Sequence, residues 1–194
     1  MKINIILSGV GGQGILSIAA VIGAAALKQG LYMKQAEVHG MSQRGGDVQS
    51  NLRLSDKSIA SDLIPQGQAD LIVSLEPMES LRYLPFLKKE GWLVTNSEPF
   101  INIPNYPDME KVRAELDKLP NKVVLDVDAI AKEVGSVRSA NIVMLGAATP
   151  FLVIAYDQIA EGIREIFSRK GEEIVDLNLK ALRAGYEVST KNQK

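Results

Sequence analysis

The sequence predicts an α/β fold: a three-layer α/β/α sandwich with a Rossmann-like start and a mixed sheet. Short runs rich in β-branched residues alternate with segments of helical length, which is typical of a layered α/β sheet. A glycine cluster joins the first of these runs to the first helical segment. A later strand alternates between apolar and polar residues and breaks a regular βαβαβ order, so we expect a mixed sheet.

The N-terminal unit is predicted to be a strand, a tight turn and a helix. Residues 3–8 form a short β-branched strand, and residues 14–29 are rich in Ala, Ile and Leu at helical length. This helix is apolar nearly all round, so we expect it to be buried on several sides. Gly30 is expected to end it.

Two predicted strands flank a polar, glycine-rich loop. Residues 31–38 form a mixed segment that we interpret as a second strand, and residues 39–46 form the loop. Residues 48–54 alternate, as a strand does when one side is buried and the other is wet or faces a partner. The first side carries Val48, Ser50, Leu52 and Leu54, and the polar side carries Gln49, Asn51 and Arg53.

The later elements continue the alternation and then become helical. A buried strand is predicted at 70–75, and Glu76-Pro77 is predicted to open a helix that runs to residue 89, because proline suits a first helical turn. Further strands are expected at 92–95 and 122–127, a loop at 97–107, and helices at 108–119, 128–134, 139–148, 158–170 behind an Asp157 cap, and 172–186, with a frayed tail at 189–194. No repeat or linker divides residues 1–194, so a single domain is expected.

Composition narrows the classes of function. The 22 basic and 23 acidic residues give a net charge of −1, which provides no field for gathering a nucleic acid. The absence of cysteine excludes disulfides, iron–sulfur ligation by this chain and cysteine nucleophiles. The apolar runs at 15–27 and 142–155 fall short of the ~20 residues of a membrane span, and residues 3–7 are too short for a signal sequence. We therefore expect a cytoplasmic protein with no membrane contact.

The first candidate site is the glycine cluster between the first strand and helix. It satisfies the pattern G-x-G-x-x-G in the context where glycines let the backbone approach a pyrophosphate at a helix N-terminus. A tight strand-to-helix turn also selects glycines without any ligand, so anion binding and turn geometry both stay open. The residues concerned are Gly9, Gly11, Gly12, Gln13 and Gly14.

A dinucleotide-binding protein is the alternative that this cluster raises. Such a site wants an acid at the end of the second strand, and Glu37 has that position. The segment after Glu37 is a glycine- and arginine-containing loop and then an alternating strand, rather than a second crossover helix. This broken order disfavours binding of NAD or FAD, although a stand-alone Rossmann-like dinucleotide-binding protein remains the alternative.

The second candidate site lies within residues 37–46. It gathers the only histidine, His39, with Arg44, Gly45 and Gly46. Backbone amides freed by the two glycines, with Arg44 beside them, would form a nest for a phosphate or carboxylate. The other interpretation is a solvated hairpin turn, which we favour for His39 over an acid/base role. His39 and Arg44 are therefore the only catalytic candidates, and neither is assigned a step.

Other catalytic patterns are missing from the sequence. No P-loop lysine follows the glycines, no G-x-S-x-G elbow occurs, and a single histidine cannot build a histidine-rich metal site. The paired acids at 126/128 and 172/173 lie at the N-termini of predicted helices, where capping explains them. The sequence therefore offers a binding surface rather than a self-sufficient active site.

Four ordered motifs resemble the gamma-type domain of the 2-oxoacid:ferredoxin oxidoreductases, and the resemblance covers nearly the whole chain. Gln43 stands where the wider family more often has an acid, which resembles the indolepyruvate branch. The motifs are Ser8-Gly-Val-Gly-Gly-Gln-Gly-Ile15, His39-Gly-Met-Ser-Gln-Arg-Gly-Gly46 followed by Asn51-Leu-Arg53, Glu76-Pro77, and residues 141–147 with Gly146-Ala147.

The resemblance implies an accessory subunit. The complex would oxidise an arylpyruvate with coenzyme A to an aryl-acetyl-CoA and carbon dioxide, and would reduce ferredoxin. A larger alpha subunit would hold thiamine diphosphate and the iron–sulfur clusters, while this chain alone would bind no cofactor and be inactive. Gly11 to Gly14 and Arg44 to Gly46 would face the large subunit, near thiamine diphosphate, the substrate carboxylate or coenzyme A. A pure scaffold is the third possibility.

Overall fold

The chain forms a six-stranded sheet in the order β2-β3-β1-β4-β5-β6. The computed structural model describes residues 1–39, 45–101 and 103–191. The strands are β1 (Lys2–Val10), β2 (Tyr32–His39), β3 (Asp47–Ser55), β4 (Ala69–Ser74), β5 (Leu87–Asn96) and β6 (Lys122–Leu125). β3 is antiparallel to both β1 and β2, whereas β1, β4, β5 and β6 are parallel. The predicted mixed sheet is confirmed.

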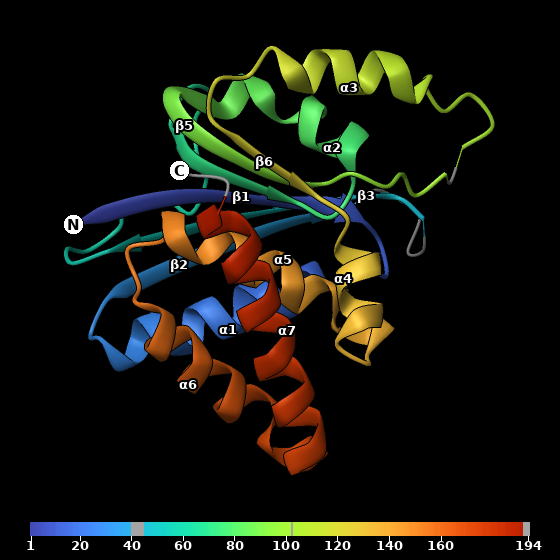
Figure 1. Cartoon of the computed structure of the whole chain (residues 1–194). Coiled ribbons are helices and arrows are strands. Elements are labelled where there is room, and N and C mark those ends of the chain that lie inside the picture. The colour runs from blue at the N-terminus through green and yellow to red at the C-terminus, as the bar shows by residue number, and fades with distance from the viewer. Residues whose placement is uncertain (40–44, 102, 192–194) are drawn as a thin grey trace.

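Helices cover both faces of this sheet and complete the predicted three layers (Figure 1). One face carries α2 (Pro77–Arg82) and α3 (Met109–Asp117); the other carries α1 (Ile15–Lys28), α4 (Val127–Glu133), α5 (Ala140–Ala148), α6 (Tyr156–Phe167) and α7 (Glu172–Lys191). Alternate residues of β1 point to opposite layers, since Ile5 and Leu7 join the core under α1 and α5 while Ile6 joins the core under α2 and α3. No helix in the described ranges is both long and apolar enough to span a membrane.

Helices α5 and α7 cross in close backbone contact at two glycines. A Cβ added to Gly146 would lie 2.0 Å from the Leu182 carbonyl oxygen, and one added to Gly185 would lie 1.9 Å from that of Val143. Neither position has room for a side chain unless the helices separate. The Gly146-Ala147 motif in the sequence is therefore accounted for by packing.

The predicted helix from residue 77 to residue 89 is wrong in its second half. α2 ends at Arg82, a 3-10 turn spans Leu84–Phe86, and β5 already begins at Leu87. Pro85 has no N–H to continue the helical hydrogen bonds, and Leu87 pairs with Ala69 of β4. The two lysines that follow therefore lie on a strand.

Smaller corrections concern the ends and exposed sides of elements. α1 is buried around Ile18 and Ile22, as expected, but its opposite side is exposed at Leu16 and Leu27. Asn51, placed on the polar side of its strand, is buried and accepts a hydrogen bond from the Ile64 N–H at 3.2 Å. Asp157 does not cap α6: the helix begins at Tyr156, two residues earlier than predicted, and the Gln158 side chain accepts from the Ala155 N–H at 3.3 Å. α7 continues to Lys191, through the start of the predicted tail.

Candidate functional site

The candidate site lies at the edge of the sheet where the parallel strands end. β1 leads into the first glycine turn there, and the β2–β3 hairpin brings its connection to the same edge. β1 lies between two different neighbours. The parallel strand β4 is on one side, and the antiparallel hairpin strand β3 is on the other. Such a switch in strand order at the carboxyl edge is where open α/β sheets bind ligands.

The structure joins the two glycine motifs that the sequence singled out. The Gly11 N–H donates to the Gly46 carbonyl oxygen at 2.9 Å, and the Gly45 N–H donates to the Gly11 carbonyl oxygen at 3.5 Å. Segments more than thirty residues apart in sequence therefore form one surface. We call this surface the paired turns, meaning residues 9–14 together with Gly45 and Gly46.

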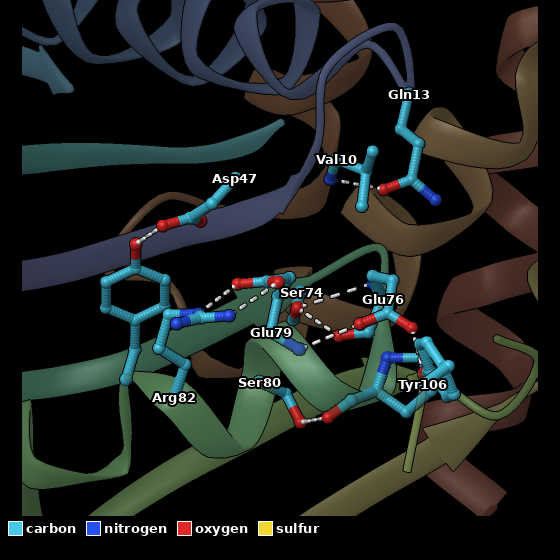
Figure 2. Close-up of polar contacts among 11 residues, drawn as sticks. Val10, Gln13, Asp47, Ser74, Glu76, Glu79, Ser80, Arg82 and Tyr106 are labelled. Atoms are coloured by element: carbon cyan, nitrogen blue, oxygen red, sulfur yellow. Dashed lines mark hydrogen bonds and ion pairs between the residues drawn. The ribbon is translucent and has the colours of Figure 1, made fainter. Parts of the chain in front are cut away.

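Gln13 closes the first turn from within. Its Oε1 accepts from the Val10 N–H at 2.7 Å (Figure 2). Its Nε2 donates to the Leu75 carbonyl oxygen at 3.0 Å, which ties the turn to the end of β4. A Cβ on Gly9 would lie 2.7 Å from the same Oε1, so glycine is needed there for a protein contact. The space beside Gly9 is thus occupied by Gln13 rather than open to a ligand.

The start of α1 is fixed by α5, a helix of the same layer. Gly14 has a φ of +83°, and its carbonyl oxygen accepts from Asn141 Nδ2 of α5 at 3.1 Å. No side chain caps this helix, and its first turn contains no acidic residue. Gly12 is exposed and a Cβ there would meet nothing within 4 Å. The positive end of the helix dipole therefore faces solvent beside an open glycine, an arrangement that suits an anionic group.

Of the other predicted site residues, Arg44 and His39 are not fully described, and Glu37 lies away from the glycine turn. Arg44 is outside the described residues, and of His39 only the backbone is described, as the last residue of β2, paired with Val48. Their proposed roles stay predictions. Glu37 lies on β2, which β3 separates from β1, and it accepts from Gln35 Nε2 at 3.0 Å. It is therefore not on the strand next to the glycine turn, as a ribose-binding acid would be.

Glu76 organises the neighbouring strand end, a role that the sequence analysis missed. Its side chain is fully buried at the N-cap of α2, where it accepts from the Glu79 N–H at 2.8 Å. The same carboxylate accepts from the Tyr106 hydroxyl (Figure 2) and, at 3.4 Å, from the Phe100 N–H. Burial, and then this contact with Glu76, raise the pKa of the Tyr106 phenol. An acid directly before proline at a helix start was the available signal.

A second, partly buried acid cluster supports the start of β3. Asp47 Oδ2 accepts from the Tyr83 hydroxyl at 2.7 Å, and Glu79 is paired with Arg82 at 2.6 Å (Figure 2). Burial raises the pKa of Tyr83, and the hydrogen bond and charge of Asp47 add to the effect. Asp47 directly follows Gly46, so this cluster lies beneath the paired turns.

The described part of the site consists of backbone groups and hydrogen-bonded polar side chains. Within residues 1–39, 45–101 and 103–191, no group of three or more histidines and acids is placed to hold a metal ion. The polar side chains of the site are bonded to neighbouring backbone or to one another, as Gln13 and Glu76 show. The chemistry available is recognition of a negative group by backbone N–H groups and a helix dipole.

Sequence comparison identifies relatives along the full chain. The profile of the family described as pyruvate ferredoxin/flavodoxin oxidoreductase matches residues 4–188. The chain is 38% identical over 195 residues to the indolepyruvate oxidoreductase subunit IorB of Archaeoglobus fulgidus, covering 96% of this chain and 94% of that protein. Relatives named as subunits of ketoisovalerate, pyruvate/ketoisovalerate or 2-oxoglutarate enzymes are 28–29% identical.

Solved structures have the same fold. A keto/oxoacid ferredoxin oxidoreductase gamma subunit from Geobacter sulfurreducens superposes with a TM-score of 0.70 at 28% identity, covering 97% of this chain and 99% of that one. The 2-oxoglutarate:ferredoxin oxidoreductase of Magnetococcus marinus superposes with a TM-score of 0.77 at 23% identity; the match covers 98% of this chain but only 31% of that longer chain. By fold and by sequence, the chain belongs to the pyruvate ferredoxin/flavodoxin oxidoreductase family.

Proposed function

We propose that this chain is the small subunit of a 2-oxoacid:ferredoxin oxidoreductase that acts on indolepyruvate. The complex would convert an arylpyruvate and coenzyme A to an aryl-acetyl-CoA, carbon dioxide and a proton, and pass two electrons to ferredoxin. The observation that carries the proposal is the full-length identity of 38% to a subunit named for indolepyruvate, against 28–29% to relatives named for other 2-oxoacids.

The residues of the chain are consistent with an accessory role. A chain without cysteine offers no thiolates for iron–sulfur clusters, so we assign the clusters and thiamine diphosphate to a larger partner subunit. The paired turns would contribute an anion-binding edge to the partner's site. Arg44 would add a positive charge for a carboxylate or phosphate. His39 is assigned no catalytic step.

Exposed apolar side chains near the paired turns support the proposal that a partner subunit covers this edge of the sheet. Leu16, in the first turn of α1, is 46% exposed, and Ile101, beside the Glu76-bound Phe100, is 70% exposed. A partner that covered these two side chains would remove their apolar surface from water. We infer that the large subunit covers this edge.

The first experiment is anaerobic affinity purification of the chain from its native cells. We expect a brown partner subunit that contains thiamine diphosphate, and viologen reduction that depends on indolepyruvate and coenzyme A. A complex that uses pyruvate in preference to indolepyruvate would refute the substrate assignment while leaving the subunit role. A colourless single chain that retains a dinucleotide would refute the subunit role and favour the alternative.

The second experiment tests the anionic edge within the purified complex. Arg44→Ala should lower the rate of indolepyruvate-dependent viologen reduction without releasing the subunit, because a charged contact to the substrate or cofactor is lost. The matched control is Arg169→Ala, a change in the 3-10 turn that follows α6. Equal activity of the two variants would remove Arg44 from the site.

A further inference from the structure

The acid cluster beneath the paired turns contains two carboxyl groups, those of Asp47 and Glu79, but only one cation, Arg82. Asp47 uses Oδ2 to accept from the Tyr83 hydroxyl, while its Oδ1 is buried and has no hydrogen-bond donor among the described residues. The carboxyl group of Glu79 lies on the same side as Asp47, whose charge and contact act on it (Figure 2). Its side chain is only 3% exposed, and Arg82 contacts its two oxygens at 2.6 and 3.3 Å.

The groups around Glu79 favour its neutral form. Arg82 and Tyr83 face it from its own segment, Asp47 faces it from β3, and Tyr106 faces it from the loop after β5. Burial raises the pKa of Glu79, and the charge and contact of Asp47 raise it further, while Arg82 opposes both. Glu79 is buried, Asp47 is partly buried, and the single guanidinium beside them is half exposed. Two neighbouring carboxylates in this setting cannot both be ionised at low cost.

We propose that Glu79 retains a proton and donates it to the otherwise unpaired Oδ1 of Asp47, so that the two acids act as a positioning pair for the paired turns. Asp47 is the first residue of β3 and follows Gly46, whose carbonyl oxygen accepts from the Gly11 N–H. A bond that fixes Asp47 to α2 therefore fixes the contact between the two glycine segments. The inference concerns this chain alone and does not depend on the substrate of the complex.

The pair makes the junction between the two glycine segments, meaning the Gly11–Gly46 contact, sensitive to pH in a defined direction. When Glu79 loses its proton, Asp47 Oδ1 loses its donor and the two carboxylates repel. An opened junction exposes Glu79 to water and returns its pKa toward the ordinary range, so opening releases a proton. Between the ordinary and the raised pKa, the opening constant should rise by up to about tenfold per pH unit and then level off.

The test is a carboxyl NMR titration of the full-length chain, combined with hydrogen exchange at the Gly11 amide. We expect the Glu79 carboxyl to titrate above its ordinary range in the wild type and at a lower pH in Asp47→Asn. Protection of Gly11, corrected for the intrinsic exchange rate, should fall with rising pH in the wild type. In Glu79→Gln, whose amide donates to Asp47 at every pH, protection should be independent of pH.

Two outcomes would overturn the proposal. One is a Glu79 carboxyl that titrates in its ordinary range in the wild type, a result that needs no variant to fold. The other is a Glu79→Gln chain whose Gly11 protection falls with pH as in the wild type. Glu133→Gln, at the exposed end of α4 on the other face of the sheet, serves as the control and should keep the wild-type profile.

Discussion

Replacing Gln13 with alanine tests whether one side chain holds the first glycine turn in shape. The change removes the acceptor of the Val10 N–H and a donor to the Leu75 carbonyl oxygen. Asn96 Nδ2 also donates to that carbonyl oxygen, at 3.5 Å, so the acceptor keeps a weak partner. Val10 is 1% exposed, and its N–H is therefore the group that loses most.

The expected cost follows from that unsatisfied donor. Leaving a buried N–H without an acceptor costs about 1–3 kcal/mol, and we expect about 2 kcal/mol because Leu75 retains Asn96. For a chain of this length, 1 kcal/mol corresponds to roughly 2–4 °C in Tm, so Gln13→Ala should unfold about 4–8 °C lower. Urea unfolding followed by circular dichroism should give the same free-energy change with an unaltered m-value.

A matched control separates this effect from the general cost of removing a glutamine. Gln66 is exposed in the loop before β4, and Gln66→Ala should change the free energy of unfolding by less than about 0.5 kcal/mol. If Gln13→Ala were as stable as the control, water would be replacing the amide, and the closure of the turn by Gln13 would be refuted. Unchanged viologen reduction by a destabilised Gln13→Ala complex would instead show that the turn is structural only.

Three further predictions concern other contacts of the fold. Gly146→Ala should destabilise the chain by about 1–3 kcal/mol or more in thermal unfolding, because the added Cβ meets the Leu182 carbonyl oxygen; unchanged stability would refute the close crossing of α5 and α7. Tyr106→Phe removes a donor to the buried Glu76 carboxylate and should speed proteolysis of the segment at 103–107, whereas wild-type cleavage would mean that the hydroxyl does not hold the segment. Because the pKa of Tyr83 is raised in the folded chain, the unfolded chain loses the phenolic proton first as the pH rises. The contribution of Tyr83 to stability is therefore complete below pH 10 and is lost as the pH rises further. Tyr83→Phe should flatten this alkaline decline in Tm, and a decline equal to that of the wild type would contradict the prediction.

The sequence predicted the layers because its signals there are local. Hydrophobic period and the strand–glycine–helix order depend on neighbouring residues, and the structure confirms the first strand, the first helix and the mixed sheet. The helix predicted to run to residue 89 was wrong because the pairing of Leu87 with Ala69 is tertiary. Pro85 was the local signal that could have corrected it.

The candidate site was predictable in part. Both glycine motifs were found, but their mutual hydrogen bonds depend on a hairpin whose register no local pattern reveals. The positioning acids were missed for the same reason, since Asp47 and Glu79 belong to different layers and are 32 residues apart in the printed sequence. Acids brought together by the fold are indistinguishable, in sequence, from acids exposed to solvent.

The hydrogen bonds within the glycine turn distinguish between two interpretations of this edge, a surface for a partner subunit and a dinucleotide-binding site. A pyrophosphate site needs N–H groups that are free until the ligand binds, but here the Val10 N–H is taken by Gln13 and the Gly11 N–H by Gly46. What stays open is the uncapped start of α1 beside the exposed Gly12. Among the described residues, such an edge offers a helix dipole and open backbone to a negative group. An edge of this kind, with Leu16 exposed alongside it, fits a surface that completes the site of another subunit better than one that works alone.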